Sequence, residues 1–175
     1  MLGMRIEEIN RKNRSISERL FPKYFEPVFD DLSSLNWIIR AGAFWWREPW
    51  SEMSEEEFDR EFGQFFDYSR DRNFLISKRP ILPLFAPSLK DDWNFLFGFR
   101  QVPADPESWI QQYWSANVRS GFVSKSTDVC FVNVDALFWE MFSNVPEWLS
   151  KARTHLQTLL DVKVSDMPIE QSHGF

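Results

Sequence analysis

The most regular pattern of hydrophobic and polar positions lies in residues 54–66. Ser54 followed by Glu57 is a capping-box pair, in which the hydroxyl and the carboxylate bond the first free backbone N–H groups of a helix. The apolar positions that follow repeat at helical spacing as one aromatic stripe: Phe58, Phe62, Phe65 and Phe66. We expect one helix through this stripe, with its rings packed inward.

Other helices are predicted from caps and apolar faces. The segment PADPESWIQQYWSA (103–116) offers Asp105 as N-cap and Pro106 at the first helical position. Looser signals predict a helical face near the N-terminus and the start of a helix at ALFWEMF (136–142). Asn144 and Pro146 open a last helix, whose apolar face is Trp148, Leu149, Ala152, Leu156, Leu159 and Leu160. The N-terminal face consists of Ile6, Ile9, Ile16 and Leu20.

Strand signals alternate with these helices. TDVCFVNVD (127–135) predicts a buried strand, and LNWIIRAGAFWW (35–46) predicts one strand or two short ones that pivot at Gly42. Residues 74–99 carry three prolines among apolar runs, which predicts short strands and tight turns at a sheet edge.

The order of these elements is mixed, without regular βαβ alternation, so the sequence predicts an α+β fold. We expect a single globular domain over residues 1–164, with a small, mostly antiparallel sheet packed against several amphipathic helices. Residues 165–175 are polar and predict a flexible C-terminal tail.

Composition narrows the classes of protein. A chain of 175 residues is large enough to bury a core without disulfides or metals. Its net charge of -6 disfavours direct binding to nucleic-acid phosphates and favours a basic partner. A lone cysteine, no apolar leader at the start, and apolar runs too short for a membrane span predict a cytoplasmic protein.

The chemically reactive side chains are few and isolated in the sequence. His155 and His173 have no partner at metal-ligand spacing, and Cys130 lies inside an apolar strand, where a thiol behaves as a small hydrophobe. The chain has neither a glycine-rich phosphate loop nor a GxSxG motif. We therefore expect no catalytic residue, no cofactor and no metal.

Carboxylate pairs leave one catalytic alternative open. Asp91 with Asp92, or Asp128 with Asp135, could serve acid–base chemistry in a hydrolase, because tryptophans can stack on sugars in an aromatic cleft. Adjacent acids more often mark a solvated turn. The alternative is a carboxylate-based hydrolase or a carbohydrate-binding protein.

Residues 41–50, AGAFWWREPW, form the densest group of rings in the sequence. Two adjacent indoles on a strand point to opposite faces, so one of them turns away from whatever the other packs against. A second layer of helices could cover the outer ring; otherwise these rings, beside an acidic helix start, suit a binding interface. The candidate interface is Trp45, Trp46, Arg47, Glu48, Trp50, Glu55, Glu56, Glu57 and Asp59.

The chain resembles, as a class, the immunity proteins that bacteria pair with secreted polymorphic toxins: it is small, acidic and aromatic-rich, and it lacks a catalytic motif. RPILPLFAPS (79–88) and STDVCFVNVDALFWEMF (126–142) are similar to segments of the SMI1/KNR4-like (SUKH) immunity group. The resemblance implies a cognate toxin or effector that is bound and neutralised, without cofactor or turnover. A homodimer through the same rings and an acidic DNA mimic are the other possibilities.

Overall fold

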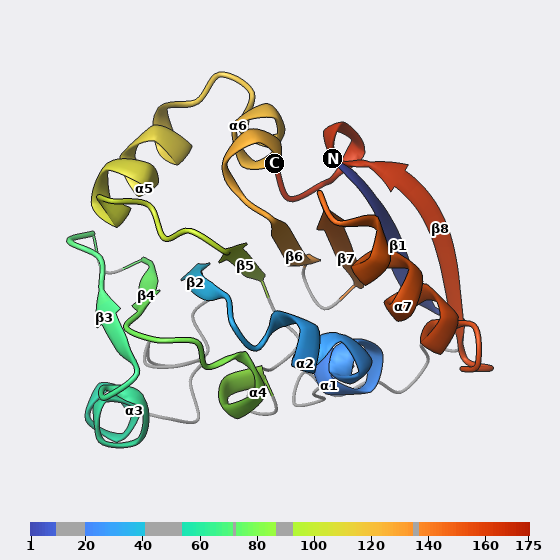
Figure 1. The fold of residues 1–175 in the computed structure, drawn as a ribbon, viewed down its shortest axis with the longest axis horizontal. Helices are drawn as coiled ribbons and strands as arrows, with labels where there is room; N and C mark the ends of the chain where they lie inside the picture. Colours follow the sequence, from blue (N-terminus) through green and yellow to red (C-terminus); the bar gives the residue numbers. More distant parts are fainter. Residues whose placement is uncertain (10–19, 41–53, 72, 87–92, 135–136) are drawn as a thin grey trace.

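The strands of the described residues form one open antiparallel sheet. The computed structural model describes residues 1–9, 20–40, 54–71, 73–86, 93–134 and 137–175 (Figure 1). Within this part of the chain, eight strands pair in the order β3-β4-β2-β5-β6-β7-β1-β8. They are β1 (Leu2–Glu8), β2 (Asn36–Arg40), β3 (Phe66–Tyr68), β4 (Leu75–Ser77), β5 (Asn94–Phe99), β6 (Val129–Val134), β7 (Phe138–Ser143) and β8 (Val162–Pro168). The predicted α+β class is confirmed.

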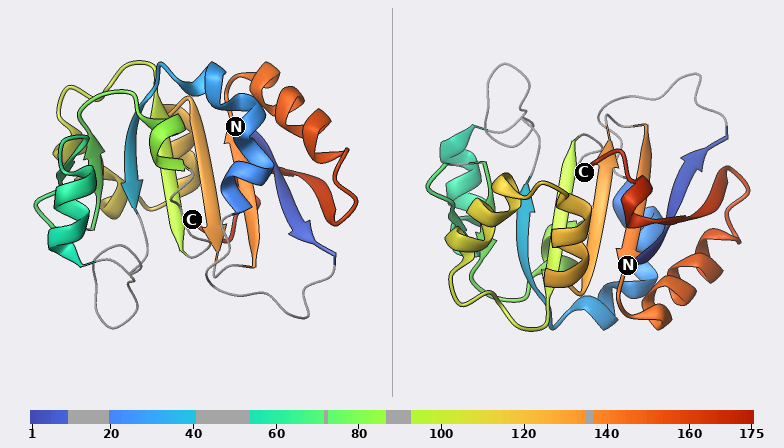
Figure 2. Two further views of the ribbon diagram at one scale, coloured as in Figure 1. Left: turned by 90° about the horizontal axis from the view of Figure 1, so that it is seen from below. Right: turned by 90° about the horizontal axis from the view of Figure 1, so that it is seen from above.

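Helices cover both faces of this sheet (Figure 2). The apolar side chains of one face pack against α1, η1, α2, α4 and α7, and those of the other face against α5, α6 and η3. The short helix α3 lies beside β3 at one end of the sheet (Figure 1). The helices are α1 (Leu20–Phe25), η1 (Glu26–Val28), α2 (Phe29–Leu32), α3 (Glu55–Phe62), α4 (Leu82–Phe85), α5 (Pro106–Ser115), α6 (Arg119–Ser126), α7 (Pro146–Leu156) and η3 (Ile169–Gln171).

The many aromatic rings are divided between these two cores. Phe131 of β6 meets the rings of α1, with its centroid 5.0 Å from Phe21 and 4.7 Å from Phe25. On the opposite face, Phe97 of β5 packs against Trp109 and Tyr113 of α5, at 5.1 and 5.4 Å. Each fully buried Phe contributes about 1.5–3 kcal/mol to stability. The high aromatic content is therefore largely core.

The caps read from the sequence are present. The Ser54 hydroxyl accepts from the backbone N–H of Glu57 at 3.2 Å, and the Glu57 carboxylate accepts from the backbone N–H of Ser54 at 2.8 Å. Asp105 accepts from the Ser108 N–H at 3.0 Å at the start of α5, with Pro106 in the first turn. The buried strand expected at 127–135 is β6.

Four expected helices were wrong in type or length. The helix after Ser54 ends at Phe62, and Phe66 opens strand β3. Residues 138–143 form β7 rather than a helix, because both faces of this strand are buried and no alternation marks it. The N-terminal residues 2–8 form β1, and α7 ends at Leu156, which leaves Leu160 96% exposed.

Two other segments also differ from expectation. β5 lies in the middle of the sheet between β2 and β6, whereas the prolines had indicated an edge. Residues 165–175 belong to the fold: β8 pairs with β1 through Pro168, and Ile169 is fully buried. The prediction of a flexible tail was wrong because it rested on the polar side chains of this segment. The segment is held in the fold largely by backbone pairing between β8 and β1.

Candidate functional site

The predicted interface is only partly described. Trp45, Trp46, Arg47, Glu48 and Trp50 lie outside the described residues, as does the side chain of Glu55. Their arrangement therefore stays a prediction. The other three predicted residues, Glu56, Glu57 and Asp59, lie in the first turns of α3.

Two of these acids hold local structure. The backbone N–H and the hydroxyl of Ser54 lower the pKa of Glu57, since both bond its charged form. Asp59 accepts from the Tyr68 hydroxyl at 2.9 Å and so joins α3 to β3. Burial, and then this bond to Asp59, raises the pKa of Tyr68 well above its usual range. An acidic helix start is thus present, but its carboxylates also serve the fold.

The side chains considered as candidates for catalysis or metal binding are, where described, buried or bonded to other parts of the fold. Burial raises the pKa of the Cys130 thiol well above its usual range, and Glu140 adds to this. His155 Nε2 lies 2.8 Å from the carbonyl oxygen of Lys23, which joins α7 to α1. Asp128 binds Arg100, accepting its backbone N–H at 2.7 Å. Asp91, Asp92 and Asp135 lie outside the described residues, and among those described no His, Cys, Asp or Glu cluster is placed to hold a metal.

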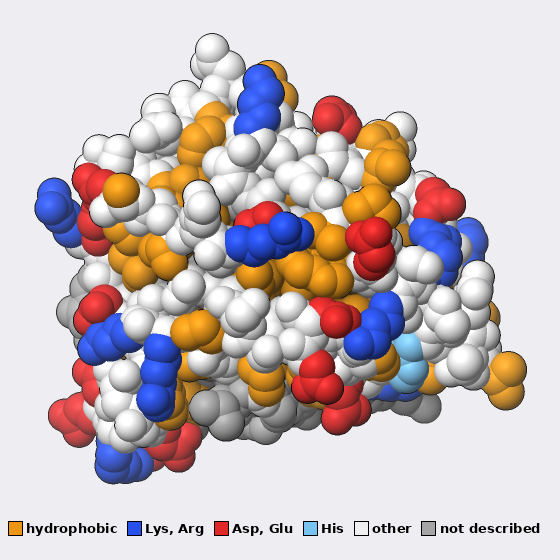
Figure 3. All heavy atoms as spheres, viewed as in Figure 1, with side chains coloured by type: hydrophobic (Ala, Val, Ile, Leu, Met, Phe, Trp, Pro, Cys, Tyr) orange, Lys and Arg blue, Asp and Glu red, His pale blue; other side chains and the backbone are white. Residues whose placement is uncertain are grey.

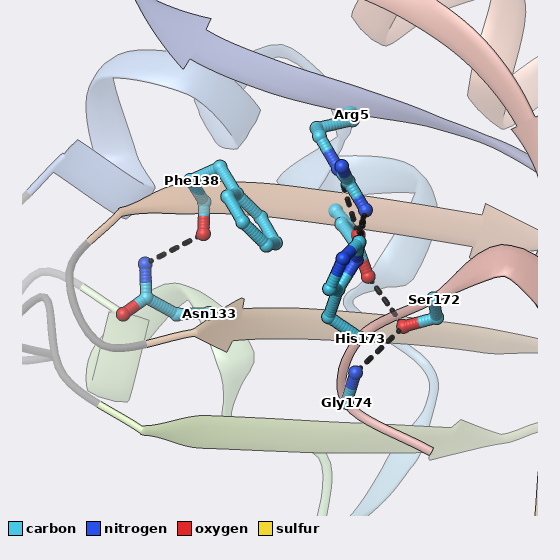
Figure 4. A network of polar contacts seen from close by, with 7 residues as sticks. Arg5, Asn133, Phe138, Ser172, His173 and Gly174 are labelled. Atoms are coloured by element: carbon cyan, nitrogen blue, oxygen red, sulfur yellow. Dashed lines mark hydrogen bonds and ion pairs between the residues drawn. The ribbon is translucent and has the colours of Figure 1, made fainter.

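A fully buried carboxylate, Glu140 of β7, stands at the centre of a polar network that the sequence did not reveal (Figure 4). Arg5 of β1 contacts its Oε1 with Nη2 at 2.6 Å and Nε at 3.0 Å. The Ser172 hydroxyl donates to Oε2 at 2.5 Å and accepts from the Gly174 N–H at 3.1 Å. Both carboxylate oxygens therefore have strong donors, which offsets the cost of burying the charge.

The guanidinium of Arg5 is held on its other sides as well. Its carbon lies 4.2 Å from the ring centre of Phe138, a cation–π distance. Its Nη2 is 2.7 Å from His173 Nδ1, which accepts because a guanidinium only donates. Neither of the two cavities described below is lined by Glu140. The network fastens the C-terminal segment to the sheet and is structural.

A groove of about 550 Å³ lies at one end of the sheet. One wall comes from the first turns of α7 and the other from the ends of β1 and β8. The lining residues are Leu2, Gly3, Pro146, Leu149, Ser150, Arg153, Asp166, Met167 and Pro168. Arg153 and Asp166 form an ion pair across it. The floor and walls are otherwise mostly apolar.

The groove adjoins a free strand edge. Among the described strands, β8 pairs only with β1, so its outer backbone groups have no strand partner. Leu2, at the mouth of the groove, is 72% exposed. An apolar groove beside an unpaired edge is a surface on which an extended segment of another chain can dock. Sequence reasoning missed it, because its walls come from three distant segments and one of these had been read as a tail.

No family model, curated protein or solved structure matches the chain. Within the described residues, no helix has the length and apolar character needed to cross a membrane. The function is therefore inferred from the geometry of the surface.

Proposed function

We propose that the chain is a non-catalytic binding protein, an immunity-type inhibitor that binds and neutralises a cognate toxin or effector protein. The observation that carries the proposal is the open apolar groove of about 550 Å³ beside the free edge of β8. A monomeric soluble protein seldom leaves such an edge and an exposed leucine together without a use for them. The resemblance to immunity proteins supplies the class of partner.

The occupant we propose is an extended segment of the partner. Its backbone adds to the outer edge of β8, and one apolar side chain enters the groove over Leu149. Backbone pairing supplies affinity, and the groove supplies specificity. Leu2, at the mouth, is covered when the segment binds.

Charge supports a basic partner. The chain carries a net charge of -6, and Glu56 and Asp59 are exposed on α3. On the face drawn in Figure 3, however, acidic and basic side chains are interspersed rather than gathered in a single acidic patch. Charge would therefore steer association and act mainly on its rate, while the groove would determine how long the complex persists.

The test combines partner capture with a matched pair of variants. Tagged protein is used to isolate a stoichiometric partner at physiological salt, and its affinity is then measured by calorimetry. Leu2→Asp places a charge at the groove mouth and is expected to weaken binding about tenfold or more. Leu160→Asp changes another exposed leucine, which lies outside the groove, and should bind as the unaltered chain does.

Two results would overturn the proposal. One is that both aspartate variants bind the partner equally well, which would exclude the groove. The other is that the isolated partner shows no activity that this chain inhibits.

A further inference from the structure

Two arginines from distant segments meet at one tryptophan on the face of the sheet that α5 and α6 cover. Arg40 ends β2, and Arg119 begins α6. The guanidinium carbon of Arg40 lies 4.8 Å from the ring centre of Trp114, and that of Arg119 lies 5.2 Å from it. Both side chains are half-buried. Since they share one ring, the two positive charges lie within about 10 Å of each other.

In the part of the chain that the structure describes, neither guanidinium has an acidic partner. Among the described residues, no carboxylate lies within ion-pair distance of Arg40 or Arg119, although the chain as a whole is acidic. Six other cations in the same part of the chain do pair with acids: Arg5, Lys23, Lys78, Arg100, Lys151 and Arg153. Removing two like charges partly from water without a counter-charge is costly. An anion within reach of both guanidiniums would offset this cost.

A hydroxyl donor stands in the same place. Tyr113 is fully buried, and the Arg40 guanidinium, which can only donate, lies close enough to act on its hydroxyl oxygen; the O–H itself has no acceptor among the described residues. Burial raises the pKa of Tyr113, while the charges of Arg40 and Arg119 act in the opposite direction. The hydroxyl therefore lies within the field of both guanidiniums. A buried O–H without an acceptor costs about 1–3 kcal/mol, which an anion would recover.

A carboxylate in contact with Trp114, that of Asp71, is already engaged. Trp114 Nε1 donates to Asp71 at 3.1 Å, which fixes the plane of the indole. The other oxygen of Asp71 accepts from the Ser69 hydroxyl and from the Asn73 backbone N–H. Burial alone would raise the pKa of Asp71, but these hydrogen bonds together lower it. Asp71 thus positions the aromatic platform and does not neutralise the arginines.

A cavity of about 400 Å³ opens beside Arg119. It is lined by Ala116, Asn117, Val118, Arg119, Ser120, Glu170 and Phe175. The residue before α6, Val118, offers no side-chain cap, so the first N–H groups of this helix remain available as donors. Glu170 on the wall of the cavity disfavours a second negative charge there.

We propose that Arg40, Arg119 and Tyr113 form a binding site for a small oxyanion, a carboxylate or a phosphate group, with the Trp114 ring as its platform. The two guanidiniums and the hydroxyl donate to the anion, and the rest of the ligand occupies the cavity at the start of α6. Because of Glu170, the remainder of the ligand is uncharged or cationic. The site is separate from the groove at β8.

The test follows the two guanidiniums directly. Sodium acetate and sodium phosphate are titrated separately into the ¹⁵N-labelled protein, against sodium chloride at equal ionic strength. The side-chain Nε–H resonances of Arg40 and Arg119 are expected to shift together and to saturate. Saturation by acetate alone identifies a carboxylate site, and saturation by phosphate alone identifies a phosphate site. If neither anion saturates these resonances, the proposal is wrong.

Two variants and a control sharpen this result. Tyr113→Phe removes only the hydroxyl and should weaken the anion about fivefold or more. Arg40→Gln combined with Arg119→Gln should abolish saturation. Arg79→Gln serves as the control, because Arg79 also stacks on a ring, 4.8 Å from the centre of Phe65, without a second arginine. Equal anion affinity in Tyr113→Phe and the unaltered chain would contradict the role of the hydroxyl. None of these readouts depends on a protein partner, so failure here leaves the proposed function untouched.

Discussion

Two arginines stand at opposite ends of one row of residues across the sheet. The row runs through Arg40, Phe95, Val132, Glu140 and Arg5, which are directly paired from β2 to β1 and therefore point to the same face. Arg5 and Arg40 both lie over aromatic rings. Arg5 has a buried carboxylate beside it, whereas Arg40 has a second arginine nearby and no acid among the described residues.

We call the Arg5 end of the row complete, because its positive charge has a carboxylate partner. We call the Arg40 end incomplete, because no carboxylate pairs with it among the described residues. At Arg5 the positive charge is matched by Glu140, both of whose carboxylate oxygens have donors, and the result is a fastened C-terminal segment. Around Arg40, the described residues offer two guanidiniums and no carboxylate within ion-pair distance. The same residue type in the same row thus stabilises the fold at one end and is suited to a ligand at the other.

The largest expected effect on stability comes from removing the charge of Glu140 at the Arg5 end of the row. Glu140→Gln keeps the shape of the side chain but leaves Arg5 without its counter-charge, so the free energy of unfolding should fall by about 3–5 kcal/mol. Urea denaturation measures this. The control is Asp31→Asn, which removes an exposed ion pair with Lys151 and should cost less than about 1 kcal/mol. Equal losses in the two variants would refute the structural role of Glu140.

Ser172→Ala should have the next largest effect. It removes a donor to the buried Glu140 and the acceptor for the Gly174 N–H, at an expected cost of about 1.5–3 kcal/mol. The substitution should also increase the rate of amide hydrogen exchange over residues 169–174 more than it does over α5. A variant as stable as the unaltered chain would show that the segment is fastened by other contacts.

At the Arg40 end of the row, removing a polar group should leave the protein equally stable or make it more stable. Tyr113→Phe removes a buried hydroxyl whose O–H has no acceptor among the described residues, so without added anion the protein should keep its stability or gain up to about 1 kcal/mol. Tyr68→Phe provides the contrast, since it loses a bond to Asp59 and should cost about 0.5–1.5 kcal/mol. Thermal melts in anion-free buffer compare the two. A loss in Tyr113→Phe as large as in Tyr68→Phe would mean that the Tyr113 hydroxyl is bonded.

The smallest expected effect is the stability that is lost at low pH when Asp71, which accepts a hydrogen bond from Trp114, becomes protonated. Because its pKa is lower in the folded chain than in the unfolded one, its contribution is fully present above about pH 4 and is lost as the pH falls through the folded value. The contribution should be less than about 1 kcal/mol, since the side chain is exposed. Asp71→Asn should remove this part of the decline in melts between pH 5 and about pH 2. An unchanged decline would assign it to other acids.

Local signals predicted the parts of the fold that local interactions build. The capping box at Ser54, the cap at Asp105 and the apolar run of β6 all depend on neighbours within a few residues. The helix predicted over 136–142 was wrong because both faces of this segment are buried, so it shows no alternation, and because the partners of the buried Glu140, Arg5 and Ser172, lie far away in the sequence.

The sites were harder to predict than the elements. The groove and the arginine cluster are each assembled from segments far apart in sequence, so no spacing in the chain marks them. The predicted tryptophan patch at Trp45, Trp46 and Trp50 lies outside the described residues and stays a prediction.

The position of β1 in the sheet also constrains how the chain is synthesised. Its two neighbours are β7 and β8, so residues 2–8 emerge from the ribosome long before the strands that flank them exist. At a translation rate of about 5–20 residues per second, the first strand waits on the order of ten seconds. During that time its apolar side chains, Met4 and Ile6, remain without their native partners. The N-terminal segment of the nascent chain therefore needs shielding from aggregation until β7 and β8 have been synthesised.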